Sequence, residues 1–133
     1  MNRHLTQLKR IIIAGSRTFN NYQFMYDRLR EVVHTTSEWH RWEIVSGGAK
    51  GADSLGERFA NENSLNLTVF PADWNTHGRS AGFIRNKHMA EYGDVLYAFW
   101  DGASPGTKNM VKQALESRVE IHLYLPGFTS FDA

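Results

Sequence analysis

The feature that most constrains the fold is a repeated sequence pattern, in which a short apolar run ends in glycines or small polar residues and an amphipathic stretch follows. The first run covers residues 10–14, includes three consecutive isoleucines and leads into Gly-Ser-Arg-Thr at residues 15–18. A continuous run of β-branched residues is typical of a strand that is covered on both faces, as in a parallel sheet. Residues 21–34 then carry apolar side chains at helical spacing, and this spacing predicts a helix.

The same cycle recurs along the chain. Further strands are predicted at residues 42–45, 66–70, 94–100 and 119–125, and further helices at 52–64, at 81–91 and from the turn at 101–107 to about Arg118. Residues 71–80 are expected to form a polar loop. Five strands that alternate with four helices predict an α/β domain of three layers, with a mainly parallel five-stranded sheet and right-handed crossovers. The loops that follow strands then gather at one edge of the sheet, where such domains bind ligands.

Size and composition narrow the class of protein. The 133 residues fit one domain, with its core at about 9–125 and a short extension at each end. There is no cysteine, and the 6 histidines lack the spacing of metal ligands, so we expect no metal site. The 15 basic and 14 acidic residues nearly cancel, so bulk charge does not favour nucleic acid as a partner. No stretch resembles a signal core or a membrane span, and we expect a cytoplasmic protein with no membrane attachment.

A glycine-rich turn at residues 46–53, Ser-Gly-Gly-Ala-Lys-Gly-Ala-Asp, joins the second predicted strand to a helix. Glycines let the backbone approach a ligand closely, and the first amides of a helix attract an anion such as phosphate. Asp53 is placed either to cap the helix or to accept a hydrogen bond from a ribose hydroxyl. The alternative interpretation is an ordinary strand-to-helix turn with a capping aspartate.

A second turn of this kind, Asp-Gly-Ala-Ser-Pro-Gly-Thr at residues 101–107, follows the fourth predicted strand. Gly106 and Thr107 are expected to open the next helix, with the threonine hydroxyl near the same anion. Two such turns at equivalent positions of one parallel sheet can hold one ligand from two sides. Arg17, which follows the first strand, is placed to bind a phosphate or a carboxylate, although a solvated turn arginine fits the sequence equally well.

The predicted helix at 81–91 places Gly82, Arg85 and Asn86 on one face. We expect the glycine to permit close approach and the arginine to clamp a phosphate or to stabilise a leaving oxygen. The alternative is a surface arginine paired with Glu91 or Asp94.

The loop before this helix contributes Trp74 and His77. The indole of Trp74 is suited to stacking on a base, although simple packing also explains a tryptophan there. His77 has the chemistry of an acid or base near neutral pH, but we expect it to be a solvated loop residue.

Taken together, these motifs resemble the SLOG superfamily of Rossmann-like domains, which is related to the Lonely Guy cytokinin-activating enzymes and to the DNA-processing protein A family. The most similar branch is that of the YspA- and YpsA-related proteins, which are small bacterial and phage proteins. The matching segments lie at residues 15–19, 46–53, 70–74, 81–89 and 99–107. Their order and spacing, rather than any single motif, carry the resemblance.

The resemblance implies a nucleotide-derived ligand and, because Lonely Guy relatives pair into dimers that complete the site, a homodimer. In those enzymes an arginine on a helix and a glutamate after the second glycine-rich turn cleave the N-glycosidic bond of a nucleoside monophosphate. Arg85 looks like that arginine, but Met110 stands where the glutamate is expected. Methionine can neither stabilise an oxocarbenium-like state nor activate water, so Asp53 and Asp101 are the alternative carboxylates. The candidate catalytic residues are therefore Arg85, Asp53 and Asp101.

Three functions stay open from the sequence. We expect first a sensor or binding domain for a nucleotide or an ADP-ribose-like ligand, with no cofactor required. The second is a nucleotide N-glycosidase of the phosphoribohydrolase type, and the third is single-stranded DNA binding, which the near-neutral charge disfavours. The expected ligand-binding residues lie in the loops after the strands and at the starts of the helices: Gly15, Ser16, Arg17, Ser46, Gly47, Gly48, Gly51, Asp53, Trp74, Gly82, Arg85, Asn86, Asp101, Gly102, Ser104, Gly106 and Thr107.

Overall fold

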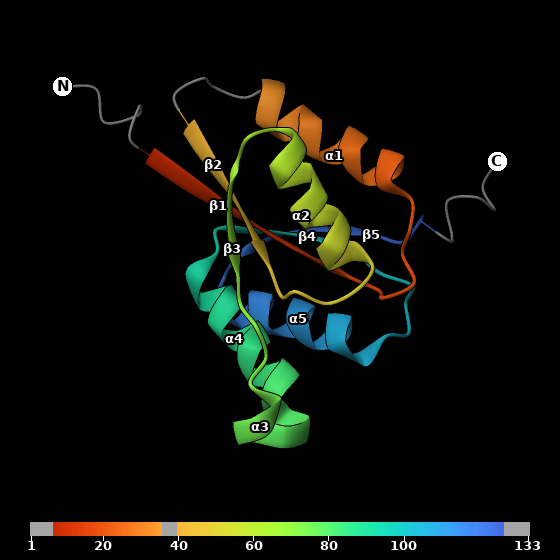
Figure 1. Cartoon of the computed structure of the whole chain (residues 1–133), viewed down its shortest axis with the longest axis vertical. Coiled ribbons are helices and arrows are strands. Elements are labelled where there is room, and N and C mark those ends of the chain that lie inside the picture. The colour runs from red at the N-terminus through yellow and green to blue at the C-terminus, as the bar shows by residue number, and fades with distance from the viewer. Residues whose placement is uncertain (1–6, 36–39, 127–133) are drawn as a thin grey trace.

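Five parallel strands form the centre of the protein, and helices lie on both faces of this sheet (Figure 1). The computed structural model describes residues 7–35 and 40–126. The strands are β1 (Gln7–Gly15), β2 (His40–Ser46), β3 (Asn66–Val69), β4 (Val95–Phe99) and β5 (Glu120–Tyr124). The helices are α1 (Tyr22–Thr35), α2 (Ala52–Glu62), α3 (Trp74–His77), α4 (Ala81–Tyr92) and α5 (Pro105–Glu116), with a 3-10 turn, η2 (Gly78–Ser80), between α3 and α4. The predicted α/β class and the parallel five-stranded sheet are confirmed.

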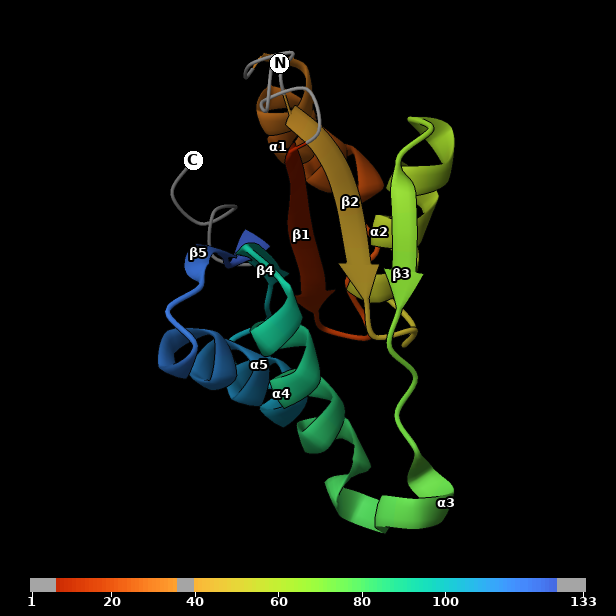
Figure 2. The ribbon, with the colours of Figure 1, turned by 90° about the vertical axis from the view of Figure 1, so that its left-hand side faces the viewer.

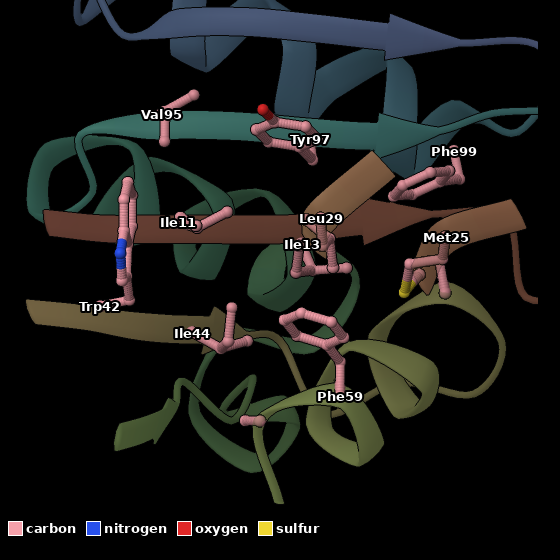
Figure 3. Packing of buried hydrophobic residues seen from close by; sticks show 12 residues of the cluster. Ile11, Ile13, Met25, Leu29, Trp42, Ile44, Phe59, Val95, Tyr97 and Phe99 are labelled. Carbon is pink, nitrogen blue, oxygen red and sulfur yellow. The ribbon is translucent and has the colours of Figure 1, made fainter. Parts of the chain in front are cut away.

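The sheet separates two apolar layers, because successive side chains of a strand point to opposite faces. Ile11 and Ile13 of β1 pack with side chains from α1 and α2, whereas Ile12 packs with side chains from α4 and α5. Figure 3 shows the first layer, where Phe59 of α2 lies against the isoleucines of β1 and β2. All three isoleucines of β1 are fully buried, as expected for a strand covered on both faces.

The spatial order of the strands is β3-β2-β1-β4-β5. The chain winds outward from β1 in both directions, so the loops after β1 and β4 leave the sheet toward opposite faces. This is the switch point of a doubly wound sheet, and a crevice forms there outside the carboxyl ends of the strands.

The segment between β3 and α4 differs from the predicted polar loop. Residues 74–80 form α3 and η2, which lie beyond the carboxyl end of the sheet, and α4 returns from them toward the strands (Figure 2). The side chain of Asp73 accepts a hydrogen bond of 3.1 Å from the amide of Thr76 and so caps α3. This Asp-x-x-Thr spacing is the local signal for the short helix, and the dense polar composition obscured it.

The predicted boundaries of the other elements are close to those observed. β1 begins at Gln7, three residues before the start of the apolar run that predicted it. This strand can start early because its first residues pair with the start of β2, from Gln7 with His40 onward. The expected C-terminal extension, residues 126–133, lies outside the described residues apart from Pro126. Within residues 7–35 and 40–126, none of the helices has the length and apolar character needed to cross a membrane.

Candidate functional site

A cavity of about 380 Å³ lies at the switch point, outside the carboxyl ends of β1 and β4. This volume is within the usual range of small-molecule sites. Eleven of the expected ligand-binding residues line it: Gly15, Arg17, Asp53, Trp74, Gly82, Arg85, Asn86, Asp101, Ser104, Gly106 and Thr107. The other six, which do not line it, are Ser16, Ser46, Gly47, Gly48, Gly51 and Gly102.

The first glycine-rich turn is packed against its own side chains and the β1 loop. A Cβ atom at Gly47 would lie 2.6 Å from Nη1 of Arg85 and 2.9 Å from Oδ2 of Asp53. A Cβ atom at Gly51, where φ is +78°, would lie 2.3 Å from the carbonyl oxygen of Ser16. Gly51 is therefore required by backbone contacts within the protein, whether or not a ligand is bound, whereas the close contacts at Gly47 are with side chains.

The side chain of Ser46 also serves the turn itself. Its hydroxyl donates a hydrogen bond of 2.7 Å to Glu57 of α2 and accepts one of 3.0 Å from the amide of Gly48. Ser46 is completely buried. These bonds fix the path of the chain from β2 into α2 and leave the hydroxyl without access to the cavity.

Asp53 is the buried carboxyl of the site. It is the second residue of α2 and is only 7% exposed, and its Oδ2 accepts a hydrogen bond of 3.1 Å from the amide of Ala49. Gly51, not Asp53, occupies the capping position of this helix. Burial raises the pKa of the Asp53 carboxyl to about 6, and the Ala49 amide and the Arg85 guanidinium act in the opposite direction.

Arg85 and Asn86 connect the two glycine-rich turns. Nη1 of Arg85 donates a hydrogen bond to the carbonyl oxygen of Gly47, and Nε donates one of 3.0 Å to Oδ1 of Asn86. Nδ2 of Asn86 donates bonds of 3.1 Å to the carbonyl oxygen of Gly106 and 3.0 Å to Oδ1 of Asn109. The guanidinium is thus held between the turns, and the structure does not pair it with Glu91 or Asp94, the alternative that the sequence left open.

The second glycine-rich turn is ordered mainly by Asp101. Its Oδ1 accepts hydrogen bonds of 2.8 Å from the amides of Ala103 and Ser104, and its Oδ2 accepts one of 2.8 Å from the hydroxyl of Ser104. These bonds, with the Ser104 amide foremost, lower the pKa of Asp101 to about 2. The buried hydroxyl of Ser16 accepts a bond of 2.9 Å from the amide of Asp101, which ties this turn to the loop after β1.

Helix α5 begins directly at the cavity. Pro105 is its first residue, and the cavity wall includes Pro105, Gly106 and Thr107. Proline has no amide proton, and the amides of the next two residues have no acceptor inside the helix because of its geometry. A Cβ atom at Gly106 would meet no atom within 4 Å, so this glycine borders open space.

The rest of the wall combines arginines with aromatic and apolar side chains. Eight lining residues are not among those expected from the sequence: Ala14, Thr18, Ala49, Arg79, Phe83, Met89, Pro105 and Met110. Arg79 and Phe83 come from η2 and α4, and Trp74, which is 54% exposed, comes from α3. Trp74 was expected at the site, whereas the positions of Arg79 and Phe83 depend on the path of the segment predicted as a loop, which periodicity and composition alone do not define.

Two further expectations concern Met110 and His77. Met110 is buried and lines the cavity one turn after Gly106, where it presents a thioether instead of a carboxylate. His77 ends α3 and is exposed, and it is not among the residues that line the cavity. Within residues 7–35 and 40–126, no group of three or more histidine or acidic side chains is arranged to hold a metal ion.

The fold and this cavity define a Rossmann-like α/β domain with a candidate ligand site at its switch point. The sequence model of the YspA, cpYpsA-related SLOG family matches residues 9–77, and the chain belongs to this family. The resemblance to the SLOG superfamily is thereby confirmed. The matched residues include the first glycine-rich turn and Trp74, whereas Arg85 and the second turn lie beyond them.

A phage protein and a solved bacterial structure are also similar to this chain. The chain is 32% identical over 120 residues to the Gene 61 protein of Mycobacterium phage D29, covering 86% of this chain and 94% of that protein. The X-ray structure of DNA processing protein A from Streptococcus pneumoniae matches with a TM-score of 0.68 and 14% identity. That match covers 90% of this chain and 51% of the other, so this chain spans about half its length, and the likeness shows the fold alone.

Proposed function

We propose that the cavity binds a nucleotide or a nucleotide-derived, ADP-ribose-like ligand, and that the protein acts as a binding or sensing domain. One observation carries the proposal: the Arg85–Asn86 pair bonds to the carbonyl oxygens of Gly47 and Gly106. Both glycine-rich turns are therefore parts of one site. Family membership supports the same class of ligand.

The start of α5 and the arginines are suited to the phosphate groups. The free amides of Gly106 and Thr107 and the positive end of the helix dipole favour an anion at this point. Arg17 and Arg79 line the same cavity and offer planar guanidinium groups for phosphate oxygens. The ligand's phosphate is expected to displace water from these donors.

Aromatic side chains are suited to the base. Trp74 and Phe83 are 54% and 48% exposed, although large aromatic side chains are usually better buried, and both line the cavity. Any nucleobase can stack on either ring, because stacking does not require base-specific hydrogen bonds. Their exposure is explained if a ligand covers them.

Calorimetric titration of the full chain tests this proposal. The panel contains nucleoside mono- and diphosphates, ADP-ribose and NAD, with inorganic phosphate and free nucleosides as partial ligands and a single-stranded oligonucleotide as the competing class. We expect at least one nucleotide-type ligand to bind more tightly than either of its parts. If none binds at millimolar concentration, or if only the oligonucleotide binds, with steep salt dependence, the proposal is wrong.

A second candidate function, nucleotide N-glycosidase activity, is favoured by the environment of Asp53. Both candidate carboxyls line the cavity, but Asp101 is committed to hydrogen bonds within its own turn, whereas Asp53 lies beside Arg85 and has a pKa raised to about 6. A carboxyl with such a pKa can accept a proton from the water that attacks the anomeric carbon near neutral pH and return it to the base that departs as the C–N bond breaks. Chromatography of nucleoside monophosphates after incubation would reveal free base and ribose phosphate. If the wild type releases no free base, this function is excluded, and if Asp53→Asn releases as much as the wild type, Asp53 is not its catalytic residue.

A further inference from the structure

A second hollow lies beside the candidate site, on the outer side of α5. This apolar groove encloses about 530 Å³. Its wall comprises Phe83 of α4, Trp100, and six residues of α5: Pro105, Lys108, Asn109, Val111, Lys112 and Leu115. Two of its residues, Phe83 and Pro105, also line the candidate site, so the two hollows are adjacent.

The outer face of α5 has the pattern of a helix that contacts another element. Lys108, Val111, Lys112 and Leu115 follow the spacing i, i+3, i+4 and i+7, so they share one face. Leu115 is 65% exposed, the largest value among the exposed large apolar side chains of the described residues. Side chains of α4 pack against the opposite, buried face of α5, through Met110 and Ala114.

The groove is shaped in advance of any partner. The indole Nε1 of Trp100 donates a hydrogen bond of 3.0 Å to the carbonyl oxygen of Ser104, which fixes the ring in the wall. A rigid aromatic wall lowers the entropic cost of binding. Single exposed apolar residues are common, but several that line one concave surface mark an interaction site.

The charges of the groove select the partner. Two lysines border the groove, and among the described residues no acidic side chain lines it. A second copy of this chain would present the same face, so a two-fold contact would bring four lysines of the two grooves into one interface without an acidic groove residue to pair them. A partner with carboxylates beside its apolar side chains pairs with both lysines.

We propose that this groove binds an acidic, amphipathic helical segment of another protein, with the partner's apolar side chains against Phe83, Val111 and Leu115 and its carboxylates against Lys108 and Lys112. This inference does not depend on the proposed nucleotide site. A bound segment would lie at the edge of the cavity, because Phe83 and Pro105 belong to both walls. The homodimer that the family resemblance implies would then use another surface.

Two synthetic helical peptides with the same leucine face test the proposal, one with glutamates and one with lysines at the flanking positions. Fluorescence anisotropy of each labelled peptide is measured against the full chain at low and high salt. We expect the acidic peptide to bind at least about tenfold more tightly, with the preference reduced by salt. In Lys112→Glu the preference should reverse or vanish, whereas Lys87→Glu, an exposed residue of α4 outside the groove, should leave it unchanged.

Leu115→Ser separates the apolar contribution from the charges. This residue is so exposed that folding is expected to be unaffected, and thermal unfolding checks this. The variant should lose affinity for the acidic peptide about tenfold or more. Equal binding of both peptides, or binding of neither, overturns the proposal. Sedimentation that shows a dimer of the wild type and a monomer of Leu115→Ser also overturns it, because a second copy then occupies the groove.

Discussion

The two glycine-rich turns resemble each other in sequence but differ in what their glycines contact. In the first turn, a Cβ atom at Gly51 would collide with the backbone of Ser16 and Arg17. In the second, a Cβ atom at Gly106 would meet nothing within 4 Å. The same strand–glycine–helix pattern thus builds an internal scaffold in one place and an open surface at the cavity in the other.

Their acidic residues differ in the same way. Asp53 is buried and its pKa is raised to about 6, whereas Asp101 is exposed, accepts three hydrogen bonds from its own turn and has a pKa lowered to about 2. In the first turn, burial disfavours the ionised form of the Asp53 carboxyl. In the second turn, the ionised Asp101 stabilises the turn through its hydrogen bonds. A glycine-rich motif alone therefore does not indicate which turn contacts a ligand.

The largest expected effect is that of Gly51→Ala. The added Cβ atom would lie 2.5 Å or less from backbone atoms of Ser16 and Arg17, at a φ of +78° that alanine disfavours. We expect the free energy of unfolding to fall by about 3 kcal/mol or more, measured by urea denaturation. Gly106→Ala is the matched control. It should change the free energy of unfolding by no more than about 0.5 kcal/mol and should lower the affinity for the ligand. Equal losses in the two variants would contradict the contrast between the turns.

The next largest effect is the pH dependence contributed by Asp53. Its folded pKa of about 6 exceeds the ordinary 3.8, so the folded state holds the proton more tightly than the unfolded chain. The stability it contributes is therefore full below pH 3.8 and is lost as the pH rises through 6. Relative to Asp53→Asn, the wild type should lose up to about 3 kcal/mol of stability across this window.

Asp101 provides the opposite sign for comparison. Its folded pKa of about 2 lies below 3.8, so its contribution is full above pH 3.8 and is lost as the pH falls toward 2. The contribution of Asp101 is measured by comparing the free energy of unfolding of Asp101→Asn with that of the wild type across the acidic pH range. A pH profile of the same sign for both aspartates would refute the assignment.

Asn86→Ala tests the connection between the turns. Asn86 is 5% exposed and makes hydrogen bonds to Arg85, to the Gly106 carbonyl and to Asn109. Its loss leaves buried polar atoms unpaired, and we expect a cost of about 2 kcal/mol, seen in thermal unfolding. Asn109→Ala removes one of these bonds and should cost less. If both cost the same, the bonds to Arg85 and Gly106 contribute nothing.

Trp74→Ala should have the smallest effect on folding and a moderate effect on binding. The side chain is 54% exposed, so stability should change little. Loss of stacking should make the binding free energy of a nucleotide less favourable by about 1–2 kcal/mol, as measured by calorimetry. His77→Ala, in the same short helix but outside the cavity wall, should leave affinity unchanged. A nucleoside lacking phosphate should lose affinity with Trp74→Ala as well, because the base makes the contact.

The fold could be predicted because periodicity and strand-ending turns are local properties of the sequence. The cavity could be predicted in outline, since parallel strands bring their following loops to one edge. The role of each residue in the site could not be predicted from the sequence. Whether the amides near Gly47 face a ligand depends on Arg85, which is 38 residues away and occupies the space beside this glycine. The positions of Arg79 and Phe83 depend on α3, whose capping by Asp73 is not evident from composition.

The central claim is that the second turn, at the start of α5, faces the ligand while the first turn supports it from within. Amide chemical shifts of the isotope-labelled protein during titration with a nucleoside diphosphate test this claim directly. The account predicts the largest changes at the amides of Gly106 and Thr107, with small changes at Gly48 and Gly51. Large changes at residues 47–51 with an unperturbed start of α5 would contradict it.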